Sequence, residues 1–235
     1  MKTVSIKHTY WDIAADIYFP DDFNSEKKYP AIISAHPIGS CKEQTSGSVY
    51  GAALAKAGFI VIAFDASFQG SSGGEPRYLE DPTMRVKDFS IVVDYLTTLP
   101  YVDAGRIGVL GICGGGGYAI NAAMTERRIK AIGTVTGANY GRLMREGFTA
   151  FNPIGALEAM AQQRTDEANG AKLRVDDLLP SSPDAALEAG LTEIDLFEAT
   201  EYYRSPRGCA PNGVNRSLSV SYTHLRAHET TLHLV

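Results

Sequence analysis

The sequence predicts an α/β fold with a doubly wound, mostly parallel sheet. Short apolar runs alternate with amphipathic helical segments between residues 31 and 136. The apolar runs lie at 31–35, 59–64, 107–112 and 129–136, and the helical segments lie at 46–57, 82–99 and 116–124. The runs show no regular polar alternation, which is typical of parallel strands covered on both faces. Strands that alternate with helices in this way form a parallel sheet.

The elements before and between these units also have local signals. Two alternating segments, 3–7 and 12–19, predict an antiparallel hairpin at the start of the chain. Asp81 followed by Pro82 is typical of a helix start, because aspartate caps free amide groups and proline is tolerated at the first helical position. The apolar face of this helix is formed by Phe89, Val92, Val93, Leu96 and Leu99.

The pattern changes after the last of these strands. Residues 139–205 have a helical composition, and we expect a helical excursion from the core that contains no strand. The core itself is expected to cover residues 1–216. Residues 217–235 do not continue its pattern, so we expect them to be a non-native tail and the sheet to lack its last two strands.

Composition narrows the class of protein. A chain of 235 residues with 44% hydrophobic residues is expected to form one domain. The net charge of −5 gives no reason to expect nucleic acid or an anionic membrane as a partner. The N-terminus lacks the apolar segment of a signal peptide, and three cysteines do not suggest a disulfide framework. We expect a cytoplasmic protein with free thiols, whose oligomeric state stays open.

The segment Gly111-Ile112-Cys113-Gly114-Gly115 has the pattern of a nucleophile elbow. An apolar strand precedes it, and a helix of small residues follows. Glycines two residues on either side of Cys113 let the strand and the helix approach each other. The helix N-terminus favours a thiolate and a developing oxyanion. Cys113 is therefore predicted to be a nucleophile, and a merely buried thiol in a packing turn is the alternative.

Two other glycine patterns compete with this interpretation. The segment 70–74 reads Gly-Ser-Ser-Gly-Gly and matches Gly-x-Ser-x-Gly, but it begins well after a strand end and runs into Glu75-Pro76 instead of a helix. We interpret it as a flexible loop that borders the site, and not as a second elbow with Ser72 as the nucleophile. Gly108, Gly111 and Gly114 do not fit the dinucleotide-binding spacing, and the strand at 129–136 ends without a carboxylate. No cofactor is expected.

Five segments in this order resemble the α/β-hydrolase superfamily, and in particular bacterial proteins similar to dienelactone hydrolases. They are AIISAHPIG, Lys42-Glu43-Gln44, FDASFQGSSGGEP, GICGGGGYA and EYYRSPRG, within residues 3–216. The resemblance implies a nucleophile, an acid and a histidine in that chain order. It places the nucleophile at Cys113 and the oxyanion-hole donors at the backbone N–H groups of Gly114 and Ile38, because Pro37 has no N–H.

The chain departs from this family pattern in two ways. Dienelactone hydrolases have a glutamate where His36 stands. His36 is expected to contact the substrate or the Cys113 thiolate, or else to be bonded to the backbone. The triad acid and histidine are expected after two further strands, and we do not find them in this chain. His224 and His228 have a spacing that suits a metal on a helix, but they lie in the expected tail. We predict no metal site.

These features predict a hydrolase that acts on esters, lactones or related small acyl compounds through Cys113. Because the triad acid and histidine are not found, we expect this 235-residue chain to be nearly inactive. A non-catalytic binding protein or a thiol redox sensor is the alternative, since a low-pKa cysteine at a helix N-terminus is oxidised without a histidine. The substrate itself is not identified by the sequence.

Overall fold

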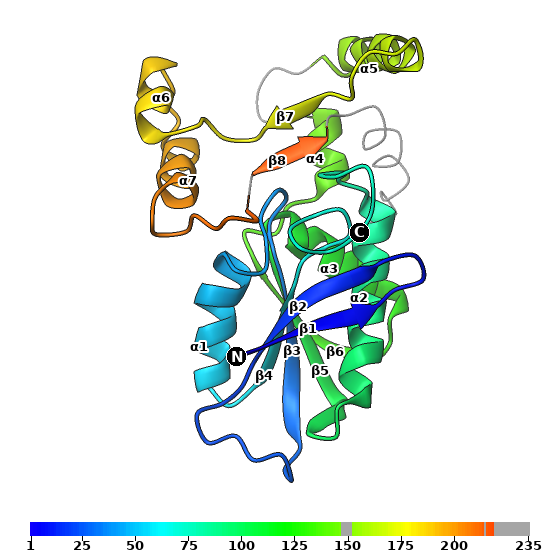
Figure 1. The fold of residues 1–235 in the computed structure, drawn as a ribbon, viewed down its shortest axis with the longest axis vertical. Coiled ribbons are helices and arrows are strands. Elements are labelled where there is room, and N and C mark those ends of the chain that lie inside the picture. The colour runs from blue at the N-terminus through cyan, green and yellow to red at the C-terminus, as the bar shows by residue number, and fades with distance from the viewer. Residues whose placement is uncertain (147–151, 214, 219–235) are drawn as a thin grey trace.

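The computed structural model describes residues 1–146, 152–213 and 215–218, and a six-stranded sheet lies at its centre (Figure 1). The strands are β1 (Lys2–Lys7), β2 (Asp12–Tyr18), β3 (Tyr29–Ala35), β4 (Ile60–Phe64), β5 (Val102–Ile112) and β6 (Ile129–Val135). Their order is β1-β2-β4-β3-β5-β6. β2 pairs antiparallel with β1 and β4, and the other neighbours are parallel. The predicted α/β class and the entry hairpin are confirmed.

Helices cover the two faces of this sheet (Figure 1). One face carries a π-helical turn, η1 (Thr45–Gly51), which runs into α1 (Ala52–Lys56). The other face carries α2 (Pro82–Thr98) and α3 (Gly114–Thr125), which pack against each other. All of β4 is buried as a result, which explains its uninterrupted apolar sequence.

The start and the apolar face of α2 follow the sequence pattern. The Asp81 carboxylate accepts the backbone N–H groups of Thr83 and Met84 at 2.9 and 3.2 Å. Each bond satisfies an amide that has no partner within the helix. The apolar face packs into the core, where Phe89 meets Phe64 edge to face at 5.6 Å between ring centres.

The region after β6 differs from the sequence prediction. It contains α4 (Tyr140–Glu146), α5 (Pro153–Ala168), β7 (Val175–Asp177), α6 (Pro183–Glu188) and α7 (Ile194–Arg204). β7 pairs antiparallel with β8 (Arg216–Leu218), so the expectation of no strand in 139–205 is wrong. A three-residue strand is too short to show a period of two, and its partner lies far along the chain.

β8 also crosses the boundary that was expected at residue 217. Ser217 and Leu218 pair with β7, and both are buried. Leu218 packs with Phe68 and Leu79, which lie in the loop after β4. These two residues therefore belong to the folded part of the chain, and residues 219–235 of the expected tail lie outside the described residues.

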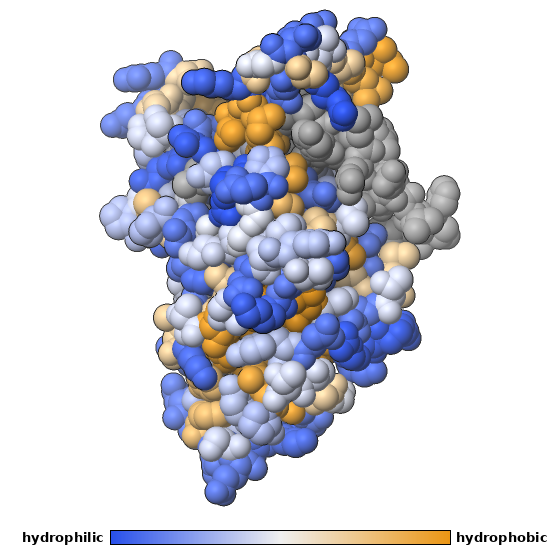
Figure 2. All heavy atoms as spheres, turned by 45° about the vertical axis from the view of Figure 1, so that its right-hand side comes forward, coloured by the Kyte–Doolittle hydropathy of each residue, from blue (hydrophilic) through white to orange (hydrophobic). Residues whose placement is uncertain are grey.

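Most of the large apolar side chains that are exposed in the described residues lie in the excursion. Figure 2 shows apolar patches in the upper part of the molecule, where Figure 1 places α5, α6 and β7. The large exposed apolar side chains of this region include Ile154, Leu173, Leu187 and Ile194. In the part of the chain that the structure describes, no helix is both long enough and apolar enough to span a membrane.

Candidate active site

Cys113 stands at a sharp turn between the end of β5 and the start of α3. Its backbone has φ 52° and ψ −121°, a region that side chains other than glycine rarely adopt. Its N–H donates to Val135 O at 2.9 Å, and its carbonyl accepts from Gly116 and Ala138, also at 2.9 Å. Three backbone hydrogen bonds thus hold the strained residue in place, and the thiol is half-buried.

The two flanking glycines are needed for the reason that the sequence suggested. A Cβ atom on Gly111 would lie 2.5 Å from the carbonyl oxygen of Gly115. A Cβ atom on Gly115 would lie 2.7 Å from the carbonyl oxygens of both Ala35 and His36. Both distances are shorter than any tolerable contact. The strand end, the helix start and the loop after β3 therefore meet only because neither residue has a side chain.

The predicted oxyanion donors lie next to each other. A Cβ atom on Gly114 would lie 3.8 Å from the backbone nitrogen of Ile38. Within the described residues, neither the Gly114 N–H nor the Ile38 N–H donates to a protein acceptor. Gly114 also begins α3, whose N-terminus has a partial positive charge. Two unpaired amides beside a half-buried thiol are suited to bind an oxyanion.

His36 is fully buried, with no exposed surface. Its Nδ1 lies 2.6 Å from Pro37 O, and its Nε2 accepts the N–H of Ala66 at 3.0 Å. Burial and the nearby Arg85 guanidinium lower the pKa of His36 well below its usual value. The structure therefore shows the backbone-bonded alternative for His36, and a contact with a substrate would require these bonds to break.

A buried ion pair between Arg85 and Glu80 holds His36 in place. Arg85 donates to His36 O at 3.0 Å, and its Nε lies 2.9 Å from Glu80 Oε1. Its guanidinium also lies over the ring of Tyr118 in α3, 5.1 Å from the ring centre. Burial raises the pKa of Glu80, although the charge of Arg85 opposes this shift. The group ties α2 and α3 to the loop after β3.

Ser72 and Asp65 form a second buried group at the carboxyl end of β4. The Ser72 hydroxyl donates to Asp65 O at 2.7 Å and accepts the Ala14 N–H at 2.8 Å. The Asp65 carboxylate accepts the N–H groups of Lys42 and Ser71 at 2.7 and 2.8 Å. Burial raises the pKa of Asp65 to about 7. These bonds make Ser72 a buried structural residue, whereas the sequence predicted only a flexible loop at this place.

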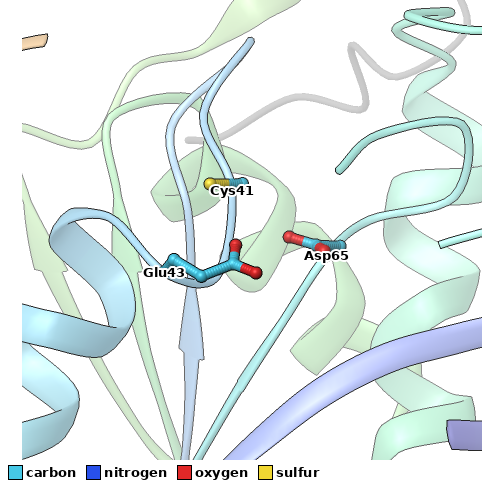
Figure 3. Close-up of side chains that lie close together, drawn as sticks. All are labelled: Cys41, Glu43 and Asp65. Carbon is cyan, nitrogen blue, oxygen red and sulfur yellow. The ribbon is translucent and has the colours of Figure 1, made fainter. Parts of the chain in front are cut away.

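Asp65 also lies near Cys41 and Glu43 (Figure 3). The sulfur and carboxylate oxygen atoms of these three side chains, which could bind a metal ion, lie within 4.8 Å of one another. Burial raises the pKa of the Cys41 thiol, which keeps it neutral. Glu43 forms an ion pair with Lys42, and Lys42 also lies 3.0 Å from Asp16 Oδ2. A buried ammonium group thus already supplies the positive charge that these carboxylates require.

Tyr203 is a site residue to which the sequence analysis gave no role. It lies in the last turn of α7, and its hydroxyl is 3.3 Å from the Thr45 hydroxyl at the start of η1. Burial raises its pKa, and Cys113 is among the groups whose charge acts on it. Beside it, Gln44 donates to Gly208 O at 2.7 Å and anchors this segment. No local signal predicts a contact between residues so far apart.

The expectation that this chain lacks the triad acid and histidine stays a prediction. The described part of the chain contains two histidines, His8 and His36. His8 lies between β1 and β2, and its ring stacks on Trp11 at 4.9 Å. In the described residues, neither histidine shares a hydrogen bond with Cys113. His224, His228 and His233 lie outside the described residues.

The chain is similar in sequence to two bacterial proteins. It is 42% identical over 230 residues to the uncharacterized protein YcjY of Escherichia coli K12, which covers 94% of this chain and 73% of YcjY. It is 38% identical over 207 residues to the uncharacterized protein PA2218 of Pseudomonas aeruginosa, which covers 86% of this chain and 54% of PA2218.

Solved structures and a family model agree with this likeness. The crystal structure of PA2218 matches with a TM-score of 0.85 at 34% identity, over 96% of this chain and 70% of that chain. The α/β hydrolase GrgF from Penicillium matches with a TM-score of 0.62 at 16% identity, over 96% of this chain and 72% of that one, which shows the fold alone. Residues 11–197 match the family model described as X-Pro dipeptidyl-peptidase (S15 family). The chain therefore has the α/β-hydrolase fold and belongs to the S15 family.

Proposed function

We propose that this chain is a hydrolase of small acyl compounds that uses Cys113 as its nucleophile. The observation that carries the proposal is the half-buried thiol in a strained elbow, beside the unpaired amides of Gly114 and Ile38. The thiolate attacks the carbonyl carbon, and the carbonyl oxygen gains the electron pair. The two amides bind this oxyanion until it collapses, expels the leaving group and leaves a thioester on Cys113. Water then hydrolyses the thioester and frees the acid.

The name of one relative, a thiohydrolase, supports a thioester substrate. The chain is 32% identical over 110 residues to the thiohydrolase aneE of Aspergillus aculeatus. The resemblance to dienelactone hydrolases implies lactones as substrates. They are acyl compounds too, because attack of the thiolate on a lactone carbonyl produces the same kind of tetrahedral oxyanion. The proposed cellular location is the cytoplasm, because a free thiol is kept reduced there.

The test is the release of p-nitrophenol from p-nitrophenyl acetate, measured in a Cys209→Ser background because Cys209 is an exposed thiol. We expect a burst of product that corresponds to acylation, followed by almost no turnover, because neither histidine of the described residues is bonded to Cys113. Cys113→Ala should abolish the burst. A burst that persists in this variant would contradict the proposal.

Two further probes separate the other candidate functions. Cleavage of Gly-Pro-p-nitroanilide in place of the ester would favour the peptidase activity that the family description names. Dimedone labelling of Cys113 after peroxide treatment, with no acylation by any ester, would favour the redox sensor.

A further inference from the structure

The hydrogen bonds of His36 fix the position of its proton. Nδ1 lies 2.6 Å from Pro37 O, and a carbonyl only accepts, so Nδ1 carries the hydrogen. Nε2 lies 3.0 Å from the Ala66 nitrogen and 3.1 Å from Arg85 Nη1, and both of these groups only donate. Nε2 is therefore unprotonated. The ring is neutral and has a single tautomer.

This tautomer determines how the next peptide unit is turned. The Pro37–Ile38 peptide is trans, so the Pro37 carbonyl and the Ile38 N–H lie in one plane and point in opposite directions. The His36 ring binds the carbonyl on one side of this unit. The N–H consequently projects from the other side. The Ile38 nitrogen lies 3.8 Å from the place that a Cβ atom on Gly114 would take, and its N–H has no protein acceptor among the described residues.

Arg85 holds the ring and its backbone together. It approaches Nε2 through Nη1 and donates to His36 O through Nη2 at 3.0 Å. The same carbonyl lies close to Gly115, where an added Cβ atom would be 2.7 Å from its oxygen. This close approach links the loop to the elbow. Arg85 is in turn held by the Glu80 carboxylate, and all three side chains are buried. The group has little freedom to move.

We propose that His36 is a positioning residue, which aims the Ile38 N–H at the oxyanion by binding the Pro37 carbonyl, and that Arg85 holds His36 in the required tautomer. This inference rests on the proposed function, because it concerns the oxyanion formed when Cys113 attacks. The lowered pKa of His36 is consistent with it, since a protonated Nε2 would lose the Ala66 bond and face the Arg85 guanidinium.

Two reactions of the same thiol test the inference. Acylation by p-nitrophenyl acetate passes through an oxyanion, whereas alkylation by iodoacetamide is a displacement at saturated carbon and forms none. His36→Gln retains an acceptor near the Nε2 position and removes the donor to Pro37 O. We expect it to slow acylation by about 100-fold, the lower end of the range for loss of an oxyanion donor. Alkylation of Cys113 should keep the wild-type rate.

The matched variant is His36→Asn, whose amide reaches the Nδ1 position and can still donate to Pro37 O. It should retain most of the acylation rate. If His36→Gln slows acylation and alkylation equally, or if His36→Asn acylates no faster than His36→Gln, the inference is wrong. Circular dichroism melts of both variants show whether they are folded.

A second measurement does not depend on acylation. The imidazole nitrogen resonances of wild-type protein should identify Nδ1 as protonated and Nε2 as unprotonated. The opposite tautomer would overturn the inference even in a protein that acylates. Failure of the proposed function has a different signature, because wild-type Cys113 would then not be acylated at all although the His36 tautomer is as described.

Discussion

Two segments of this chain share the spacing of a nucleophile elbow, and they do opposite things. In the segment 111–115, Cys113 is half-buried at a turn from strand to helix. In the segment 70–74, Ser72 is 2% exposed and its hydroxyl has two backbone partners. The comparison shows that Gly-x-nucleophile-x-Gly does not by itself produce a nucleophile. The strand before the turn and the helix after it present the side chain at the surface of the site.

The glycines also serve different purposes in the two segments. Gly111 and Gly115 let a strand and a helix approach each other through their backbones. Gly70 has φ 50°, and a Cβ atom there would overlap the carboxyl group of Asp65. The first pair makes room for the architecture of the elbow, and Gly70 makes room for a buried side chain.

The largest expected difference between the segments is in acylation. Cys113→Ala should abolish acylation, because the thiol that accepts the acyl group is removed. Ser72→Ala should leave the rate unchanged but destabilise the fold by about 1–3 kcal/mol, because the buried Ala14 N–H loses its acceptor. Stopped-flow assays and chemical denaturation measure the two effects. A loss of acylation in folded Ser72→Ala would reverse the assignment.

The next prediction concerns the packing of the elbow. Gly111→Ala should lower the free energy of unfolding by about 2–3 kcal/mol, because its Cβ would press on the backbone of α3. Gly108→Ala is the control in the same strand, since its Cβ would lie 3.4 Å from Ala131 O. Urea denaturation should show only a small effect for the control. If both variants lose the same free energy of unfolding, the effect comes from alanine anywhere in β5 and not from the packing of the elbow.

The pH dependence of stability should arise beside the loop that contains the segment 70–74, and not in the elbow. Asp88 binds the backbone N–H and the hydroxyl of Ser67 in this loop, and burial raises its pKa from 3.8 to about 7. The folded protein then binds more protons than the unfolded chain between these values, so its stability falls as the pH rises through that window.

Asp88→Asn keeps an acceptor for the Ser67 N–H and removes this titration. We expect the stability to fall by on the order of 1–2 kcal/mol less between pH 5 and pH 7 than in the wild type. Thermal melts across this range provide the measurement. Asp65 should maintain the rest of the slope, since its pKa is also about 7. An unchanged slope would show that Asp88 titrates normally.

The smallest expected effect concerns α7. Tyr203→Phe removes the hydroxyl that lies near Thr45 and interacts electrostatically with Cys113. We expect this variant to acylate a few-fold more slowly. Tyr202→Phe is the control, because its ring packs edge to face on Tyr203 and lies beside Arg207 instead. Rates that change equally in the two variants would remove Tyr203 from the site.

The features predicted correctly from sequence are those encoded locally. The elbow glycines, the Asp81 cap and the apolar strands each depend on neighbours within a few residues. The role of His36 depends on Ala66 and Arg85, which lie 30 and 49 residues away. β7 and Tyr203 likewise depend on distant partners. No periodicity or spacing in the sequence reports such contacts.

The most direct test of the assignment of Cys113 is the position of the acyl group. The Cys209→Ser protein is incubated with p-nitrophenyl acetate, quenched in acid and mapped by peptide mass spectrometry. We predict one acetyl group, located on the peptide that contains Cys113. An acetyl group on Ser72, or a protein that releases p-nitrophenol while Cys113 stays unmodified, would contradict the account.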